Sequence, residues 1–153
     1  MTLIRPATVS DEAFLREMLY AALFVPPDEP PLPREILDDP KVAHYVDAFG
    51  TSNGDVGFIA VEGEPIGAAW VRLLTGDDRG FGYVDDDAPE LSIAVVPEHR
   101  GNGLGTALME CLLAEAPRCS LSVDDRNPAL RLYERLGFVT VSSRRHSLTM
   151  LRE

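Results

Sequence analysis

Three glycines alternate with other residues in the segment Arg100-Gly101-Asn102-Gly103-Leu104-Gly105-Thr106, which lies between a strand-like stretch and a helix-like stretch. Glycines let the backbone approach a ligand closely and turn several N–H groups toward it. The first turn of the following helix adds unpaired N–H donors and a partial positive charge. This succession of strand, glycine loop and helix predicts a site for an anionic group, and a pyrophosphate suits it well.

Three alternative interpretations of the loop fit less well. A Walker loop requires Gly-Lys-Ser/Thr, which is absent here, so we reject it. A dinucleotide fingerprint would place its third glycine at Thr106, and Pro97–Arg100 separates the strand from the loop; only Asp124 stands at roughly the expected distance. A turn that binds nothing is the third alternative, and three alternating glycines behind an arginine weigh against it.

Hydrophobic spacing predicts a mixed α/β sheet flanked by helices. Thr8 and Asp11 form a capping box before a helix, and a second helix is expected from Arg34 to about Phe49 after a proline-rich connector. Residues 55–74 predict an antiparallel hairpin that turns at 62–65. The expected order is β-α-α-β-β-β-α-β-α-β-β, with a parallel strand pair around the glycine loop.

Length and composition exclude several classes of protein. The 153 residues suit a single domain over 1–153, and 45% hydrophobic with 25% charged residues are typical of a globular chain. A net charge of −11 argues against nucleic acid as a partner and favours a cationic substrate. We expect no membrane segment, no signal peptide and a cytoplasmic location. Two cysteines and three scattered histidines predict no metal site.

The glycine loop and its surroundings resemble the GNAT N-acetyltransferase superfamily. RGNGLG fits that family's Arg/Gln-x-x-Gly-x-Gly/Ala signature, ELSIAVVPEHR resembles its central strand, and NPALRLYERLGF is similar to its Asn-x-x-Ala-x-x-x-Tyr-x-x-x-Gly-Phe helix. The element order agrees over nearly the whole chain. The resemblance implies a GNAT-like fold and acetyl-coenzyme A (acetyl-CoA) as cosubstrate, and it leaves the acceptor open.

The resemblance also implies which residues hold the coenzyme. Backbone groups of the central strand should pair with the pantetheine arm as an added strand would. The loop should surround the pyrophosphate, and Asn127 should reach the pantetheine or only cap its helix. The expected coenzyme-binding residues are Ile93, Ala94, Val95, Val96, His99, Arg100, Gly101, Asn102, Gly103, Leu104, Gly105, Thr106 and Asn127.

Two residues are candidate catalysts. Tyr133 stands at the family's tyrosine position and would protonate the departing thiolate; alternatively it is a core aromatic on the apolar stripe of its helix. Glu90 is the candidate base because a carboxylate starts an otherwise apolar strand; alternatively it is a solvated strand end. A bulge in the Glu90–Val96 strand, as in relatives, would direct N–H groups at the oxyanion.

The sequence therefore predicts direct acetyl transfer from acetyl-CoA to the amine of a small molecule or peptide. A non-catalytic acyl-CoA-binding or sensor module on the same fold is the main alternative, and a dinucleotide-dependent oxidoreductase is the other. The acidic runs Asp77-Asp78 and Asp85-Asp86-Asp87 would attract a cationic amine or simply solvate a loop. Acyl-chain preference and the choice between monomer and homodimer stay open.

Overall fold

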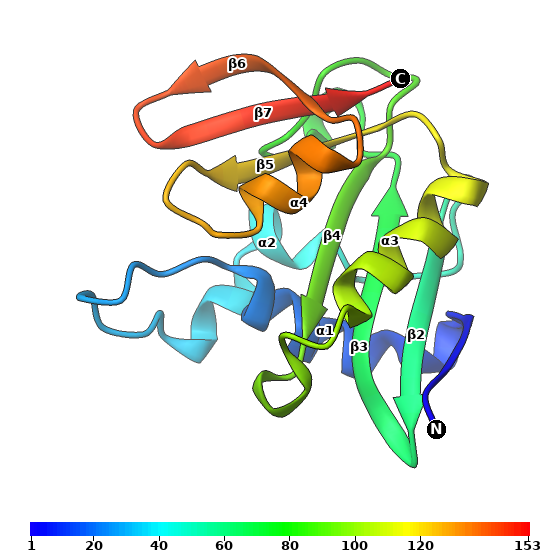
Figure 1. The fold of residues 1–153 in the computed structure, drawn as a ribbon. Coiled ribbons are helices and arrows are strands. Elements are labelled where there is room, and N and C mark those ends of the chain that lie inside the picture. Colours follow the sequence, from blue (N-terminus) through cyan, green and yellow to red (C-terminus); the bar gives the residue numbers. More distant parts are fainter.

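A computed structural model describes all 153 residues as one seven-stranded sheet in the order β1-β2-β3-β4-β5-β7-β6 (Figure 1). The element order expected from the sequence is confirmed. The strands are β1 (Leu3–Pro6), β2 (Val56–Glu62), β3 (Glu64–Arg72), β4 (Glu90–Val95), β5 (Cys119–Asp124), β6 (Val139–Arg144) and β7 (Ser147–Arg152). The helices are α1 (Glu12–Ala22), α2 (Pro40–Ala43), α3 (Leu104–Glu115) and α4 (Leu130–Arg135), with 3-10 turns at Val9–Asp11, Arg34–Asp38, Gly76–Asp78 and Pro97–His99.

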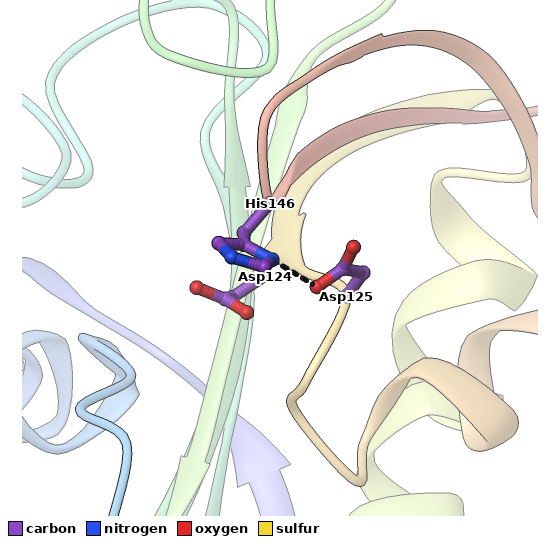
Figure 2. Close-up of side chains that lie close together, drawn as sticks. All are labelled: Asp124, Asp125 and His146. Atoms are coloured by element: carbon purple, nitrogen blue, oxygen red, sulfur yellow. Dashed lines mark hydrogen bonds and ion pairs between the residues drawn. The ribbon is translucent and has the colours of Figure 1, made fainter.

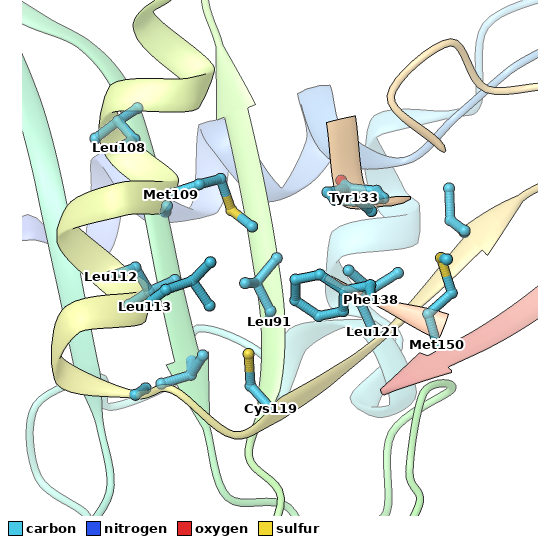
Figure 3. Packing of buried hydrophobic residues seen from close by; sticks show 14 of the residues in the cluster. Leu91, Leu108, Met109, Leu112, Leu113, Cys119, Leu121, Tyr133, Phe138 and Met150 are labelled. Atoms are coloured by element: carbon cyan, nitrogen blue, oxygen red, sulfur yellow. The ribbon is translucent and has the colours of Figure 1, made fainter. Parts of the chain in front are cut away.

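Helices cover both faces of the sheet and create two hydrophobic cores. On one face α3 packs against β2, β3 and β4, and its side chains Leu108, Met109 and Leu112 are completely buried (Figure 3). On the other face α1 packs against β3 and β4, and the buried Leu15 and Trp70 belong to this second core. Burial of these apolar surfaces is the main force that holds the layers together. No helix combines the length and the apolar character needed to cross a bilayer.

The antiparallel half of the sheet is regular up to β4. The β2–β3 hairpin turns at Gly63, where φ is +76°, which glycine adopts without strain. Strand β4 pairs with β3 in an unbroken register from Gly67↔Val95 to Arg72↔Glu90. The expected bulge in β4 is therefore wrong; the irregularity lies in β2, between Ala60 and Val61.

Strands β4 and β5 separate almost as soon as they meet. They form the expected parallel pair, but its only matched residues are Glu90 and Ser120, where the Ser120 N–H donates to the Pro89 carbonyl at 2.9 Å. Beyond this point the strands diverge, as Figure 1 shows. The centre of the sheet is thus open between β4 and β5.

The second helix expected from Arg34 to about Phe49 is wrong as a continuous element. Only the 3-10 turn at Arg34–Asp38 and the four residues of α2 are helical, and turns follow. Pro40 explains the interruption because proline has no N–H and disfavours a helical conformation in the residue before it. Asp39 accordingly has an extended backbone and caps α2 through the Lys41 N–H.

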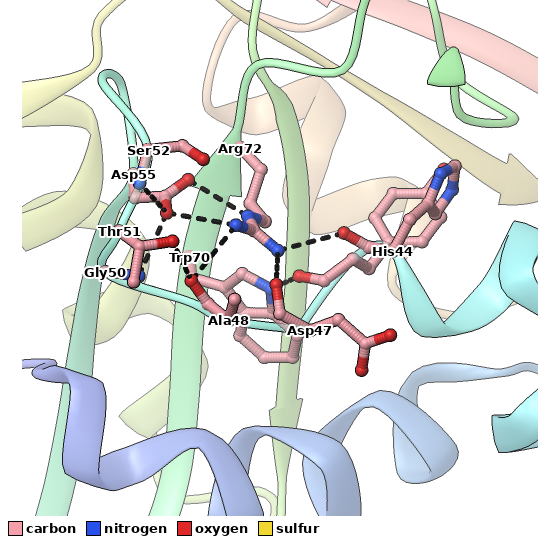
Figure 4. A network of polar contacts seen from close by, with 10 residues as sticks. His44, Asp47, Ala48, Gly50, Thr51, Ser52, Asp55, Trp70 and Arg72 are labelled. Atoms are coloured by element: carbon pink, nitrogen blue, oxygen red, sulfur yellow. Dashed lines mark hydrogen bonds and ion pairs between the residues drawn. The ribbon is translucent and has the colours of Figure 1, made fainter. Parts of the chain in front are cut away.

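A buried arginine anchors the segment after α2 to the sheet. Arg72 on β3 is 6% exposed; its guanidinium pairs with both oxygens of Asp55 and donates to the carbonyls of His44 and Asp47 (Figure 4). On the same strand the Trp70 indole N–H donates to the Tyr45 carbonyl at 2.9 Å. Two side chains of one strand therefore fix residues 44–48 by their carbonyls, without regular secondary structure.

Candidate active site

Two adjoining hollows lie where β4 and β5 diverge. The aromatic cavity, about 270 Å³, is bounded by Phe24, Tyr45, Phe81 and Tyr133 together with residues of β4 and β5. The loop groove, about 550 Å³, runs along β4 past Arg100 and Gly105 of the glycine loop. Residues Ala22, Leu23, Phe24, Ile93, Asn127 and Tyr133 border both hollows. A ligand in one hollow would therefore adjoin a ligand in the other.

The edge of β4 that faces β5 has backbone groups available to a ligand. The Val96 N–H bonds to the Ile66 carbonyl, which directs alternate residues of the strand, Ala94 among them, toward β3. The backbone groups of Ile93 and Val95 accordingly point toward β5. The Val95 carbonyl is already bonded to Arg100 Nε at 2.9 Å. Of the four strand residues expected to bind the coenzyme, Ile93 offers the freest edge.

The glycine loop has the backbone conformation that its sequence predicts. Gly101 and Gly103 have φ values of +82° and +78°, and Gly103 caps α3. An added Cβ would meet nothing within 4 Å at either glycine, so the adjacent space is open to a ligand. These features suit an anion at the start of a twelve-residue helix.

The predicted coenzyme residues divide between two surfaces. Arg100 and Gly105 border the loop groove, as do the β4 residues Ile93, Ala94 and Val95. On the other side of the loop, His99, Asn102, Gly103 and Leu104 border a hollow beside β1 and β2. There His99 Nδ1 lies 3.6 Å from Glu62 Oε2. Val96, Gly101 and Thr106 border none of these three hollows.

Asn127 and Tyr133 come from the segment that follows β5. The Asn127 side-chain oxygen accepts the Ala129 N–H at 2.9 Å, which is the predicted capping role, while its residue borders both hollows. The Tyr133 ring packs edge-on against Phe138, with centroids 5.9 Å apart, and also borders both hollows. Burial raises the pKa of the Tyr133 phenol to about 12. Tyr133 is therefore a core aromatic and a wall of the site at once.

Glu90 is buried, at 2% exposure, so its alternative as a solvated strand end is wrong. Its Oε1 accepts the Tyr45 hydroxyl and the Gly82 N–H, both at 2.9 Å, and its Oε2 accepts the Gly80 N–H at 2.8 Å. The Tyr45 oxygen in turn accepts the Phe81 N–H at 2.8 Å. We call this arrangement of Tyr45, Glu90 and residues 80–82 the latch.

The latch requires glycine on both sides of Phe81. A Cβ at Gly80 would lie 2.3 Å from both Glu90 Oε1 and the Tyr45 hydroxyl, and one at Gly82 would lie 2.6 Å from the backbone of Leu121. The sequence prediction missed Tyr45, Gly80, Phe81 and Gly82 as site residues. The Gly-Phe-Gly triplet was the available signal, because two glycines beside an aromatic residue favour close backbone approach.

Charged groups at the end of β5 are mutually paired. Asp124, Asp125 and His146 lie within reach of one another, and His146 Nδ1 is 3.0 Å from Asp125 Oδ1 (Figure 2). Asp124, however, binds Arg126 through both oxygens, and this hydrogen bonding lowers the pKa of Asp124 to about 2. The guanidinium takes the place that a cation would need. The pairing also leaves Asp124 poorly suited to bind a ribose.

The acidic runs are partly engaged as well. Asp85 forms a bidentate ion pair with Arg118, and hydrogen bonding from Arg118 lowers the pKa of Asp85 to about 2. Asp78 contacts His44 at 2.8 Å. The runs therefore hold their loop in place through side-chain contacts.

Comparison with known proteins assigns the chain to a family. Residues 15–138 match the Acetyltransferase (GNAT) family. Mycothiol acetyltransferases of Streptomyces griseus and Streptomyces coelicolor are 34% and 32% identical over 137 residues, covering 85% of this chain but 40% of their own length. The chain thus spans less than half of these curated relatives.

Solved structures agree with the fold. The structure of the acetyltransferase YncA from Salmonella typhimurium, with its cofactor acetyl-CoA, superimposes with a TM-score of 0.67 at 24% identity, covering 100% of this chain and 93% of that one. The mixed sheet with flanking helices expected from the sequence is confirmed. At this level of identity the likeness concerns the fold alone.

Proposed function

Because the chain belongs to the Acetyltransferase (GNAT) family, we propose that it transfers an acetyl group from acetyl-CoA directly to an amine. One observation supports this most: the opening between β4 and β5 joins the loop groove to the aromatic cavity, and Tyr133 borders both. A thioester end in the groove and an amine in the cavity would meet beside the Tyr133 phenol.

The loop groove has the features that acetyl-CoA requires. The free edge of β4 at Ile93 can pair with the amide groups of an extended chain, as a neighbouring strand would. Gly101, Gly103 and the start of α3 suit its pyrophosphate, with Arg100 beside them. Asn127 borders the groove opposite β4 and is proposed to contact the same arm. We retain the other predicted residues as loop positions that shape this site.

Tyr133 is the proposed general acid. Acetyl-CoA supplies an activated acyl group and a thiolate that must be protonated as it leaves. Burial keeps the phenol protonated at neutral pH, because it raises the pKa of Tyr133 to about 12. The hydroxyl can therefore donate a proton when the thiolate forms. The Ile93 N–H, on the unpaired edge of β4, is proposed to stabilise the carbonyl oxygen as negative charge develops.

Glu90 is the proposed base, acting directly or through water. Three donors bind its carboxylate, but Oε2 receives only the Gly80 N–H and keeps further acceptor capacity. Its residue also borders the aromatic cavity. An alkyl ammonium has a pKa of about 10, so proton removal is needed before attack at neutral pH.

Direct transfer is favoured over an acyl-enzyme. Neither Cys111 nor Cys119 borders the cavity or the groove. Burial also raises the pKa of the Cys119 thiol to about 11, which leaves little thiolate to act as a nucleophile.

The test is release of free thiol from acetyl-CoA in the presence of a panel of amines. Amine-dependent release supports the proposal, whereas acetyl-CoA binding without transfer to any amine would favour the sensor alternative. The acceptor used by mycothiol acetyltransferases belongs in the panel because the Streptomyces relatives carry that name. A cytoplasmic location and a homodimer stay predictions, to be tested by cell fractionation and light scattering.

A further inference from the structure

Phe81 is a large aromatic side chain that is held in place without being covered. It is 59% exposed, yet its own N–H and those of both neighbouring glycines are bound by Tyr45 and Glu90. Its ring stacks on Tyr45, with centroids 6.4 Å apart and an interplanar angle of 17°. Fixing an exposed apolar ring against a cavity has no evident benefit for the fold, because the ring itself buries little surface.

The rest of the aromatic cavity is predominantly apolar. Of its 18 lining residues, 12 are hydrophobic, and Phe24 and Leu23 approach from the end of α1 while Phe81 approaches from the loop before β4. These side chains would cover the carbon skeleton of an acceptor. Apolar contact of this kind is worth about 25 cal/mol for each Å² removed from water.

The cavity has no charge left for a second charged group on the acceptor. Its lining contains no Lys, Arg or His, so an acceptor carboxylate or phosphate would find no cation there. The two acidic lining residues are engaged, Glu90 by three donors and Asp124 by Arg126. A second ammonium group would therefore meet no unpaired carboxylate, and burying it would be costly.

Resting on the proposed acetyl transfer, we infer that the acceptor is a primary amine attached to an uncharged apolar or aromatic body, and that Phe81 determines this specificity by packing against that body. The Tyr45–Glu90 latch positions Phe81. The single reacting ammonium is the only charge that the site is built to accept.

The experiment compares acceptors on the full chain with acetyl-CoA. The panel contains 2-phenylethylamine, ethanolamine, putrescine with its second ammonium, and phenylalanine with its carboxylate. The wild type is expected to favour 2-phenylethylamine in kcat/KM over the other three by about tenfold or more, the discrimination that an apolar pocket contact supplies. Phe81→Ala should remove that preference through KM, with the rate for ethanolamine nearly unchanged. Val139→Ala is the matched control because Val139, on β6, is equally exposed at 59%.

The outcomes separate the two proposals. Preference for putrescine or phenylalanine, or an equal loss for all acceptors in Phe81→Ala, would overturn the inference while acetyl transfer stands. Absence of both amine-dependent thiol release and a thermal shift with acetyl-CoA would remove the proposed function itself. Loss of the 2-phenylethylamine preference in Phe81→Ala but not in Val139→Ala supports the inference.

Discussion

The Tyr45 hydroxyl donates to Glu90 Oε1 at 2.9 Å and joins two residues 45 positions apart in the chain. Burial, together with the adjacent Glu90 charge, raises the pKa of Tyr45 well above its ordinary value, so the phenol remains a donor. Arg72 and Trp70 fix the backbone around Tyr45, and Glu90 begins β4. The wall of the cavity is thereby tied to the centre of the sheet.

Replacing Tyr133 by Phe should lower kcat by about 10²–10⁴-fold, the usual contribution of a general acid. The ring and its packing on Phe138 would stay, so affinity for acetyl-CoA should change little. Because burial raises the pKa of Tyr133 to about 12, ionisation of this phenol should cause no loss of wild-type activity below about pH 11. Steady-state kinetics from pH 6 to 10 measure both effects. Wild-type turnover in the variant would leave Tyr133 as a core aromatic alone.

Glu90→Gln should lower activity most near neutral pH, where the amine is protonated and needs a base, and recover in part at alkaline pH. The structure shows that this variant also disturbs the latch, since an amide NH₂ would face one of three donors.

Tyr45→Phe separates the two effects because it weakens the latch and keeps the carboxylate. Its loss is expected to be uniform across pH and to appear mainly in the KM of the amine. If the ratio of the two variants' kcat/KM values does not change with pH, Glu90 positions the loop and another group removes the proton.

Gly103→Val should abolish the thermal shift that acetyl-CoA produces. The new side chain would fill the space beside the loop amides, which is open in the protein. A ligand at 100 times its Kd stabilises the folded state by about 2.7 kcal/mol, so the loss is measurable by thermal unfolding. Gly76→Val is the control: φ there is +62°, its Cβ would also meet nothing within 4 Å, and it lies outside the groove. Both variants carry a similar backbone strain, and only Gly103→Val should lose the shift.

Arg72→Met should reduce the free energy of unfolding by about 3–5 kcal/mol, the cost of leaving a buried partner unpaired. Asp55 would keep a side chain only 2% exposed without its guanidinium, and the carbonyls of residues 44–48 would lose their donor. Arg16→Met removes the exposed pair with Asp38 and should cost about 1 kcal/mol or less. Urea denaturation of the three proteins measures the difference; equal costs would mean that the Arg72 network adds no more than a surface pair.

The sequence predicted the parts of the fold that local patterns encode. The β2–β3 hairpin and α3 follow from periodicity and from glycines with positive φ, and each lies where it was expected. The second helix failed because the apolar spacing continues through Pro40, while the backbone does not.

The site was predictable only where its residues follow one another in sequence. The glycine loop and Asn127–Tyr133 are such segments. The latch joins residues 36 and 45 positions apart, and its hydrogen bonds depend on how the segment after α2 lies across the sheet. Neither spacing nor composition carries that information.

The single matched pair between β4 and β5 also has a consequence for local unfolding. With so few backbone bonds across its middle, the sheet is divided into one unit of β1–β4 and another of β5–β7, and such units open separately in native-state hydrogen exchange. Amides of Ile93 and Val95 should exchange faster than those of Ala94 and Val96, which are turned toward β3. A ligand lying along β4 would then act as a cooperative link, slowing exchange in both units at once.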